Sequence, residues 1–267
     1  MSDTTSRLAF CTLGMPGESL ASVAALARRT GWCGVELRSA VDEPVHVGMS
    51  AGDVERARRD LEGVVVVATD SYVKVGSVGQ HDDEIVDAAL AEATLALSLG
   101  TTAVRVFPGD EAESGTSTYV DREEAMIRRL AAAAERLPDG VELWLETHGS
   151  HRTGEAVARV LAAVDDLRVR AIWDIAHPGK AGERWQRTLE QLRPYLAHVQ
   201  IKDERPGQVP MFLGEGDVPI TEIVGALESG GYSGWYSLEY ERKWHPESPP
   251  LEDALTSGSD WWRDQGL

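Results

Sequence analysis

Four oxygen-bearing side chains each follow a short apolar run in the second half of the sequence. The runs finish in Leu145-Glu146, Trp173-Asp174, Val199-Gln200 and Leu238-Glu239. A single carboxylate in such a place usually caps a helix or lies on the surface, but four on consecutive strands favour a shared role. Carboxylates that converge away from water need a cation between them. An all-oxygen set selects Mg²⁺, Mn²⁺ or Co²⁺, so the sequence predicts one divalent metal ion.

The elements that must position these side chains alternate along the whole chain. Short apolar runs predict strands at Leu8–Leu13, Gly34–Leu37, Val64–Ala68, Ala103–Phe107, Glu142–Glu146, Ala171–Asp174, Ala197–Ile201 and Trp235–Glu239. Between them, helical patterns include Leu20–Arg29, Asp82–Leu99, Arg122–Leu137, Glu155–Val164 and Ile220–Ser229. Such alternation indicates parallel strands joined by crossover helices. Eight units predict a (β/α)8 TIM barrel, whose functional residues lie at the C-terminal ends of the strands.

The joints between helices and strands support this fold. Gly31-Trp32-Cys33-Gly34 and Gly231-Tyr232-Ser233-Gly234 each lead from a helical pattern into a strand, and glycine suits the left-handed position that ends a helix. No Gly-x-Gly-x-x-Gly follows the first strand, which disfavours an open doubly wound sheet. The length of 267 residues is close to one barrel, and no linker composition interrupts it. We therefore expect a single domain over residues 1–267.

Composition excludes several classes of partner. Acidic residues outnumber basic ones 44 to 26, for a net charge of −18, which opposes binding to nucleic acid. The first residues lack the apolar region of a signal peptide, and no apolar run reaches the ~18 residues of a membrane helix. Cys11 and Cys33 lie in apolar stretches, as buried reduced thiols do. We expect a cytoplasmic protein with no membrane or nucleic-acid partner.

The strand-end motifs resemble those of a known family. Leu-Glu-Thr-His-Gly (145–149), Trp-Asp-x-x-His-Pro (173–178), His-Val-Gln-Ile-Lys-Asp (198–203), Leu-Gly-Glu-Gly-Asp-Val-Pro (213–219) and Ser-Leu-Glu-Tyr-Glu (237–241) are similar to motifs of the xylose isomerase-like barrel superfamily. That group includes sugar epimerases, hydroxypyruvate isomerase, inosose dehydratase and endonuclease IV enzymes. The resemblance is strongest from about residue 140 to 247.

The resemblance implies a metal site and an acid/base pair. The implied metal ligands are Glu146, Asp174, Gln200 and Glu239. Many relatives have histidine at the position of Gln200, which leaves the identity and affinity of the metal open. Glu146 and Glu239 come from strands three apart, and the matching glutamates of the sugar epimerases move a proton next to a carbonyl. We expect the same two residues to be catalytic here.

Further polar residues near the strand ends are candidates for substrate binding. His177 follows Asp174 by three positions. Side chains two positions apart in a strand lie on the same face, so Lys202 is expected to point the same way as Gln200. The alternatives are a helix-capping histidine and a salt bridge from Lys202 to Glu215 or Asp217. The remaining candidates are His148, Glu36, Arg38 and Arg205.

Several of these candidates have structural alternatives. Glu36, Arg38 and Arg105 can instead form structural ion pairs, and the turn Gly214–Asp217 can cradle an anion or simply lead into a helix. Trp244 is a candidate pocket wall. Trp261 and Trp262 are expected to anchor a terminal helix or an oligomer interface.

Three reactions would use such a site: aldose–ketose isomerisation, epimerisation, and β-elimination of water from a keto-sugar or keto-inositol. Family frequency favours an isomerase or epimerase acting through an enediolate on a small sugar, polyol or keto-acid. A non-catalytic sugar-binding or partner subunit is the alternative from another class, and a homo-oligomer is allowed. The endonuclease branch needs extra histidines after strands three, four and seven, where this chain has Ala68-Thr69-Asp70, Phe107-Pro108-Gly109 and Gln200-Ile201-Lys202.

Overall fold

Eight parallel strands form the core of the protein. A computed structural model describes residues 4–109, 119–205 and 208–266. The hydrogen-bonded order β1-β10-β7-β6-β5-β4-β3-β2 closes on itself as a barrel, so the predicted (β/α)8 fold is confirmed. The strands are β1 (Leu8–Cys11), β2 (Gly34–Arg38), β3 (Val65–Lys74), β4 (Ala103–Phe107), β5 (Glu142–Glu146), β6 (Val169–Asp174), β7 (Leu196–Ile201) and β10 (Tyr236–Leu238).

The chain forms two compact units, which are described separately. Unit 1 comprises residues 1–67 and 199–267, and unit 2 comprises residues 68–198. Strands β3 and β7 each contribute residues to both units. The assignment of residues 1–267 to one domain stays a prediction.

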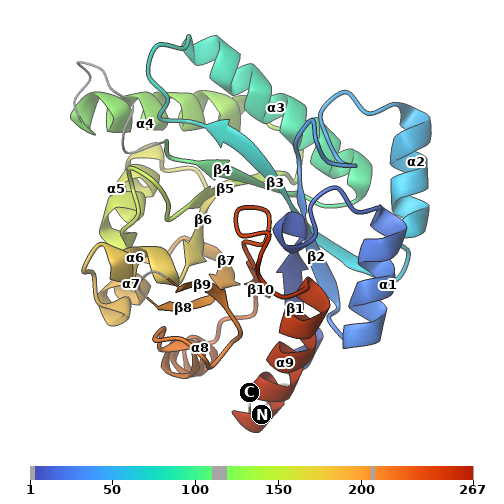
Figure 1. The fold of residues 1–267 in the computed structure, drawn as a ribbon. Coiled ribbons are helices and arrows are strands. Elements are labelled where there is room, and N and C mark those ends of the chain that lie inside the picture. The colour runs from blue at the N-terminus through green and yellow to red at the C-terminus, as the bar shows by residue number, and fades with distance from the viewer. Residues whose placement is uncertain (1–3, 110–118, 206–207, 267) are drawn as a thin grey trace. The chain divides into compact units, whose positions relative to one another are not determined.

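Unit 1 is built on the parallel pairing of β1 with β2 and β10, and of β10 with β7. Ser237 pairs with Gln200 in this register. The helices are α1 (Leu20–Thr30), α2 (Ala51–Asp60), α8 (Ile220–Ser229) and α9 (Leu251–Asp264). Helices α1 and α9 lie side by side (Figure 1). The indole of Trp32 donates to the Leu255 carbonyl at 3.0 Å and Trp262 is fully buried, as expected for residues that anchor the terminal helix.

Unit 2 continues the same pattern. Strand β4 pairs in parallel with β3 and β5, and β5 pairs with β6. Its helices are α3 (Asp82–Leu99), α4 (Tyr119–Arg136), α5 (Gly154–Val164), α6 (Ala176–Lys180) and α7 (Trp185–Leu192). Helix α3 packs against α4, and α5 against both α4 and α7 (Figure 1). The aliphatic residues of β4 and β5 are buried almost completely, whereas Trp144 is partly exposed.

The two glycine joints adopt the predicted conformation. Gly31 follows α1 with φ of 77°, and Gly231 lies just after α8 with φ of 81°. Both values fall in the left-handed region that glycine enters without a steric penalty. The chain therefore changes direction within two residues of the end of each helix and continues into the next strand.

Several predicted boundaries are corrected. Strand β1 ends at Cys11, where a 3₁₀ turn η2 (Thr12–Gly14) begins, while another, η1 (Thr4–Arg7), precedes β1. Strand β3 extends to Lys74, because the Ser71 hydroxyl and the Val75 amide continue its pairing with β4. Strand β10 stops at Leu238, so Glu239 follows the strand. A two-stranded antiparallel sheet of β8 (Asp203–Arg205) and β9 (Gln208–Met211) was not predicted.

The prediction that both cysteines are buried is wrong for one of them. Cys11 is buried in β1, whereas Cys33 is exposed, and both are free thiols. Cys33 lies between Gly31 and the first residue of β2, in the turn rather than the strand. The reduced state expected of both agrees with the structure.

Candidate active site

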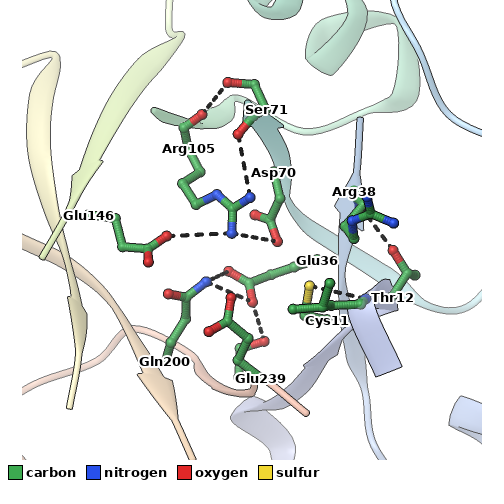
Figure 2. A network of polar contacts seen from close by, with 12 residues as sticks. Cys11, Thr12, Glu36, Arg38, Asp70, Ser71, Arg105, Glu146, Gln200 and Glu239 are labelled. Carbon is green, nitrogen blue, oxygen red and sulfur yellow. Dashed lines mark hydrogen bonds and ion pairs between the residues drawn. The ribbon is translucent and has the colours of Figure 1, made fainter. Parts of the chain in front are cut away.

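A buried polar cluster of unit 1 joins β2, β7 and β10. Ser237 donates to Glu36 at 2.5 Å, and the Gln200 amide nitrogen lies 3.3 and 3.5 Å from the two oxygens of the same carboxylate (Figure 2). Glu36 and Gln200 are fully buried. Among the residues that the structure describes, the Gln200 Oε1 atom has no hydrogen-bond partner. A buried acceptor of this kind is costly unless it meets a donor or a cation.

A second cluster of unit 1 surrounds Lys202. Its ammonium group donates to Glu239 at 2.5 Å and to Glu241 at 2.7 Å. Lys202 and Glu239 are each only 5% exposed, so water screens this ion pair weakly. The structural alternative for Lys202 was a salt bridge to Glu215 or Asp217, and the structure gives it ion pairs with Glu239 and Glu241. The ammonium is a charge partner for one proposed acid/base glutamate.

The turn Gly214–Asp217, for which an anion cradle was one of two alternatives, binds a carboxylate of this chain. Asp203 accepts backbone hydrogen bonds from Gly214 at 2.8 Å, Gly216 at 2.9 Å and Val218 at 3.2 Å. A Cβ atom at Gly216 would lie 2.0 Å from Asp203 Oδ1, which explains the glycine. These amides are committed to holding the loop, so they do not support an external anion site. Asp203 itself was not predicted.

The two arginines of unit 1 that are candidates for substrate binding form ion pairs. Arg38 is buried and bonds to Glu43, and its backbone amide donates to Thr12 (Figure 2). Arg205 is exposed and lies 3.3 Å from Asp217. The Arg38 contact matches the structural alternative given for that residue, whereas the Arg205 pair was not predicted. A role in substrate binding stays a prediction for both. Trp244 is 57% exposed.

Unit 2 places Glu146 beside a guanidinium group. Arg105 lies 3.4 Å from Glu146 and 3.7 Å from Asp70 through the same Nη1 atom, and its other Nη atom is 3.4 Å from the Ser71 carbonyl (Figure 2). Glu146 is 1% exposed and Asp70 fully buried. The guanidinium also lies over the Phe107 ring at 4.3 Å, which fixes its position. Arg105 thus serves two buried carboxylates at once.

Asp174, His177 and His148 form a neighbouring group of unit 2. One oxygen of Asp174 accepts from the Ala176 amide at 2.9 Å, and the other lies 3.4 Å from His177 Nε2. The rings of His148 and His177 meet edge to face at 4.7 Å. Asp174 therefore holds the start of α6 and touches the histidine that α6 carries. His177 is a member of α6, where Ile175 occupies the capping position.

A polar network behind His148 was not predicted. His151 is buried, lies 3.1 Å from the Ser150 hydroxyl and 3.2 Å from Glu123, and stacks on the Tyr119 ring at 4.4 Å. Burial lowers the pKa of His151 to about 4, so the ring is neutral near pH 7. The His151 amide also donates to the His148 carbonyl at 3.0 Å. The network fixes the turn on which His148 stands.

The missed residues differ in the signal that they leave in the sequence. Ser237 and Glu241 stand two positions on either side of Glu239, so alternation along an extended segment could have found them. Asp203 could have been found only from Gly216, because a side chain at that position would collide with its carboxylate. His151 and Glu123 are 28 positions apart, and no local pattern connects them.

The donors fit a divalent cation in chemical type. Glu146, Asp174, Gln200 and Glu239 are all buried and all offer oxygen, the ligand atom that Mg²⁺ and Mn²⁺ prefer. The Gln200 oxygen that lacks a hydrogen-bond partner within the described ranges is a structural feature that a cation would satisfy directly.

Comparison with known proteins identifies the family. The model of the xylose isomerase-like TIM barrel matches residues 24–265. The chain belongs to this family. A Streptomyces coelicolor protein named "Putative hydroxypyruvate isomerase" is 27% identical over 181 residues, which are 63% of this chain and 60% of that relative.

Solved structures of this family share the fold at low identity. A structure titled IOLI protein with a binding zinc atom has a TM-score of 0.81 at 17% identity and covers 97% of each chain. The probable 3-DHS dehydratase AsbF of Bacillus anthracis has a TM-score of 0.78 at 18% identity, over 96% of this chain and 98% of that one. A D-psicose 3-epimerase with D-fructose has 0.79 at 12% identity, over 95% and 96%. In the described parts of this chain, no helix is long and apolar enough to cross a membrane.

Proposed function

We propose that this protein is a divalent-metal-dependent isomerase or epimerase that removes a proton next to the carbonyl of a small sugar, polyol or keto-acid. The observation that carries the proposal is that Glu146 and Glu239 are both buried and that each lies beside a positively charged side chain. Glu146 and Glu239 are buried at the ends of β5 and β10, and each lies against a cation of its own unit. Buried carboxylates at barrel strand ends are suited to acid/base work rather than to surface solubility.

The chain's own residues divide the work of the proposed reaction. A bound divalent cation would polarise the substrate carbonyl and stabilise the negative charge that develops on its oxygen. Glu146, Asp174, Gln200 and Glu239 are its proposed ligands, with Mn²⁺, Mg²⁺ or Co²⁺ as candidates. One glutamate, as a carboxylate, accepts the proton from the carbon, and the other, as a carboxylic acid, donates its own proton to the adjacent carbon or to the opposite face of the same carbon. The substrate passes through an enediolate in both cases.

Four of the proposed binding residues contact other residues of the candidate site within their own unit. In unit 1, Lys202 donates to Glu239 and Glu36 lies beside Gln200. In unit 2, His148 and His177 contact each other near Asp174. We assign these four side chains to substrate hydroxyl and carbonyl groups, and extend the assignment to Arg38 and Arg205. A cytoplasmic location and a possible homo-oligomer belong to the same proposal.

Proton exchange tests the proposal. The protein is loaded with Mn²⁺, Mg²⁺ or Co²⁺, incubated in D₂O with ketoses, keto-acids and keto-inositols, and followed by NMR. We expect metal-dependent deuterium uptake at one carbon that is lost in Glu146→Gln and Glu239→Gln. Glu142→Gln is the matched control, because Glu142 is at the opposite end of β5 and binds Trp144. It should retain exchange.

One observation favours a β-eliminating dehydratase as the second candidate. Elimination needs a base for the proton on carbon and an acid for the departing hydroxyl group. Glu239 and the Lys202 ammonium provide such a pair at 2.5 Å. Formation of an unsaturated product in the same assay would support elimination, and an isomeric or epimeric product would support the first candidate. Bound metal without exchange on any substrate would favour a non-catalytic subunit.

A further inference from the structure

A compact group of ligand atoms lies entirely within unit 2. Glu146, His148 and His177 each offer one ligand atom, and the three atoms lie within 4.8 Å of one another. Two come from the end of β5 and its following turn, and the third from α6. Glu146 is buried, while the two histidines are partly exposed, so an ion has access to this group from solvent.

The donor types differ from the all-oxygen set of the proposed function. Two imidazoles and one carboxylate are the ligands of a borderline divalent cation such as Zn²⁺ or Co²⁺, with one position left for water. Asp174 Oδ2 lies 3.4 Å from His177 Nε2 and provides the carboxylate that commonly orients a metal-bound histidine. Mg²⁺ would be a poor occupant, because it prefers oxygen ligands.

The geometry requires only a small adjustment. Zinc ligands at about 2.1 Å from the ion are about 3.4 Å from one another, so atoms now within 4.8 Å must approach by at most about 1.4 Å. The backbone of this region is already fixed, because the His151 amide donates to the His148 carbonyl and the Ala176 amide of α6 donates to Asp174.

One neighbouring charge opposes a cation here. Arg105 lies 3.4 Å from Glu146, and its guanidinium would repel an ion bound by that carboxylate. Asp70, 3.7 Å from the same guanidinium nitrogen, partly compensates its charge. The balance predicts moderate affinity that increases when Arg105 is neutralised.

We propose that Glu146, His148 and His177 form a binding position for a borderline divalent cation, Zn²⁺ or Co²⁺, that does not require Gln200 or Glu239. The proposal extends the proposed function by giving unit 2 a nitrogen-ligated cation of its own. It assigns to His148 and His177 a role as ligands in the absence of substrate. The two proposals share Glu146, so an ion at this position would alter the acid/base chemistry of that residue.

Metal titration of the substrate-free protein tests this position. Zn²⁺ affinity is measured by competition with a chromophoric chelator, and Co²⁺ is followed by its visible spectrum and by hyperfine coupling to nitrogen. We expect nitrogen coupling in the wild-type protein. His148→Ala and His177→Ala should each lower Zn²⁺ affinity at least tenfold and lower Mn²⁺ affinity less than threefold. Arg105→Gln should raise Zn²⁺ affinity several-fold.

Controls separate this position from other metal binding. Gln200→Ala should leave Zn²⁺ affinity within twofold, and His46→Ala should do the same because His46 bonds to its own turn at Val47. Circular dichroism checks that each variant is folded, and the wild-type nitrogen signal does not depend on any variant. Oxygen-only coupling, or Zn²⁺ affinity unchanged in both histidine variants, would overturn the inference. Enolisation with oxygen-only coupling would support the proposed function and overturn the cation position. Nitrogen coupling without turnover on any substrate would support the cation position and overturn the proposed function.

Discussion

The two units neutralise their proposed catalytic glutamates in different ways. In unit 1, Glu239 accepts a direct hydrogen bond from Lys202 at 2.5 Å, and Glu241 binds the same ammonium. In unit 2, Glu146 lies 3.4 Å from a guanidinium that also serves Asp70, and its ligand atoms lie near two imidazoles. The charge on Glu239 is therefore balanced internally, whereas Glu146 belongs to a group that can accept a further cation.

This difference indicates a division of labour. Lysine is a compact charge whose hydrogen bonds are easily rearranged, while an arginine held under an aromatic ring keeps its position. We expect Glu239 to exchange its partner when substrate or metal arrives. Glu146 should remain fixed by its neighbours.

The largest effect is expected from the carboxylate that holds the loop beside Lys202. Asp203 is 2% exposed and accepts bonds from three amides of the loop at 214–218. Asp203→Ala should lower the free energy of unfolding by about 3–5 kcal/mol, because several buried donors lose a charged acceptor. Urea unfolding measures the change. Asp217→Ala, in an exposed pair, should cost less than about 0.5 kcal/mol; equal losses would contradict the assignment.

The next effect concerns the exchangeable partner of Glu239. Lys202→Met leaves two carboxylates near each other without their shared ammonium, and we expect a loss of about 3 kcal/mol in metal-free protein. Saturating Mn²⁺ should recover part of it, since a cation that binds Glu239 replaces the missing charge. Thermal unfolding with and without Mn²⁺ checks this. A metal-induced shift smaller than that of the wild type would break the contrast between the units.

Acid should destabilise unit 2 through His151. Its pKa of about 4 in the folded protein lies below the 6.5 of an exposed histidine, so the unfolded chain binds more protons below pH 6.5. Stability from this residue is complete above pH 6.5 and is lost towards pH 4, by about 2 kcal/mol at pH 5. Hydrogen exchange at pH 7 and pH 5 should show reduced protection around residues 147–153. The effect should disappear in His151→Asn, which does not titrate.

The smallest effect is expected at Arg205. Its ion pair with Asp217 is exposed at 3.3 Å, so Arg205→Ala should change stability by less than about 0.5 kcal/mol. The KM of Arg205→Ala, measured by steady-state kinetics, then tests the proposed role of Arg205 in substrate binding. A rise in KM of tenfold or more would support substrate binding, and unchanged KM would assign Arg205 to the surface pair alone.

The sequence predicted the fold because its signal is local and repeated. The bounds of β4, β5, α3 and α8 agree with the prediction to the residue, since each is a continuous apolar or amphipathic run between turn residues. The short helices α6 and α7 and the sheet of β8 and β9 were missed. They depend on tertiary contacts, such as the Asp174 bond that starts α6.

The candidate site was predictable only in part. Strand ends pointed to Glu146, Asp174, Gln200 and Glu239, because position in a barrel strand determines where a side chain can act. The partners of these residues could not be deduced, since Arg105 reaches Asp70 and Glu146 across three different strands. The hydrogen bond from Lys202 to Glu241 likewise depends on the path of the loop that follows β10.

The central claim is that Glu146 and Glu239 move a proton next to a carbonyl. Deuterium incorporation from D₂O, followed by NMR in wild-type protein and in Glu146→Gln, Glu239→Gln and Glu142→Gln, tests it most directly. We predict metal-dependent exchange at one carbon, a decrease of about 10²–10⁴-fold in each of the first two variants, and wild-type exchange in Glu142→Gln. Exchange that persists in Glu146→Gln or Glu239→Gln, or that is absent from metal-loaded wild-type protein on every substrate, would contradict the claim.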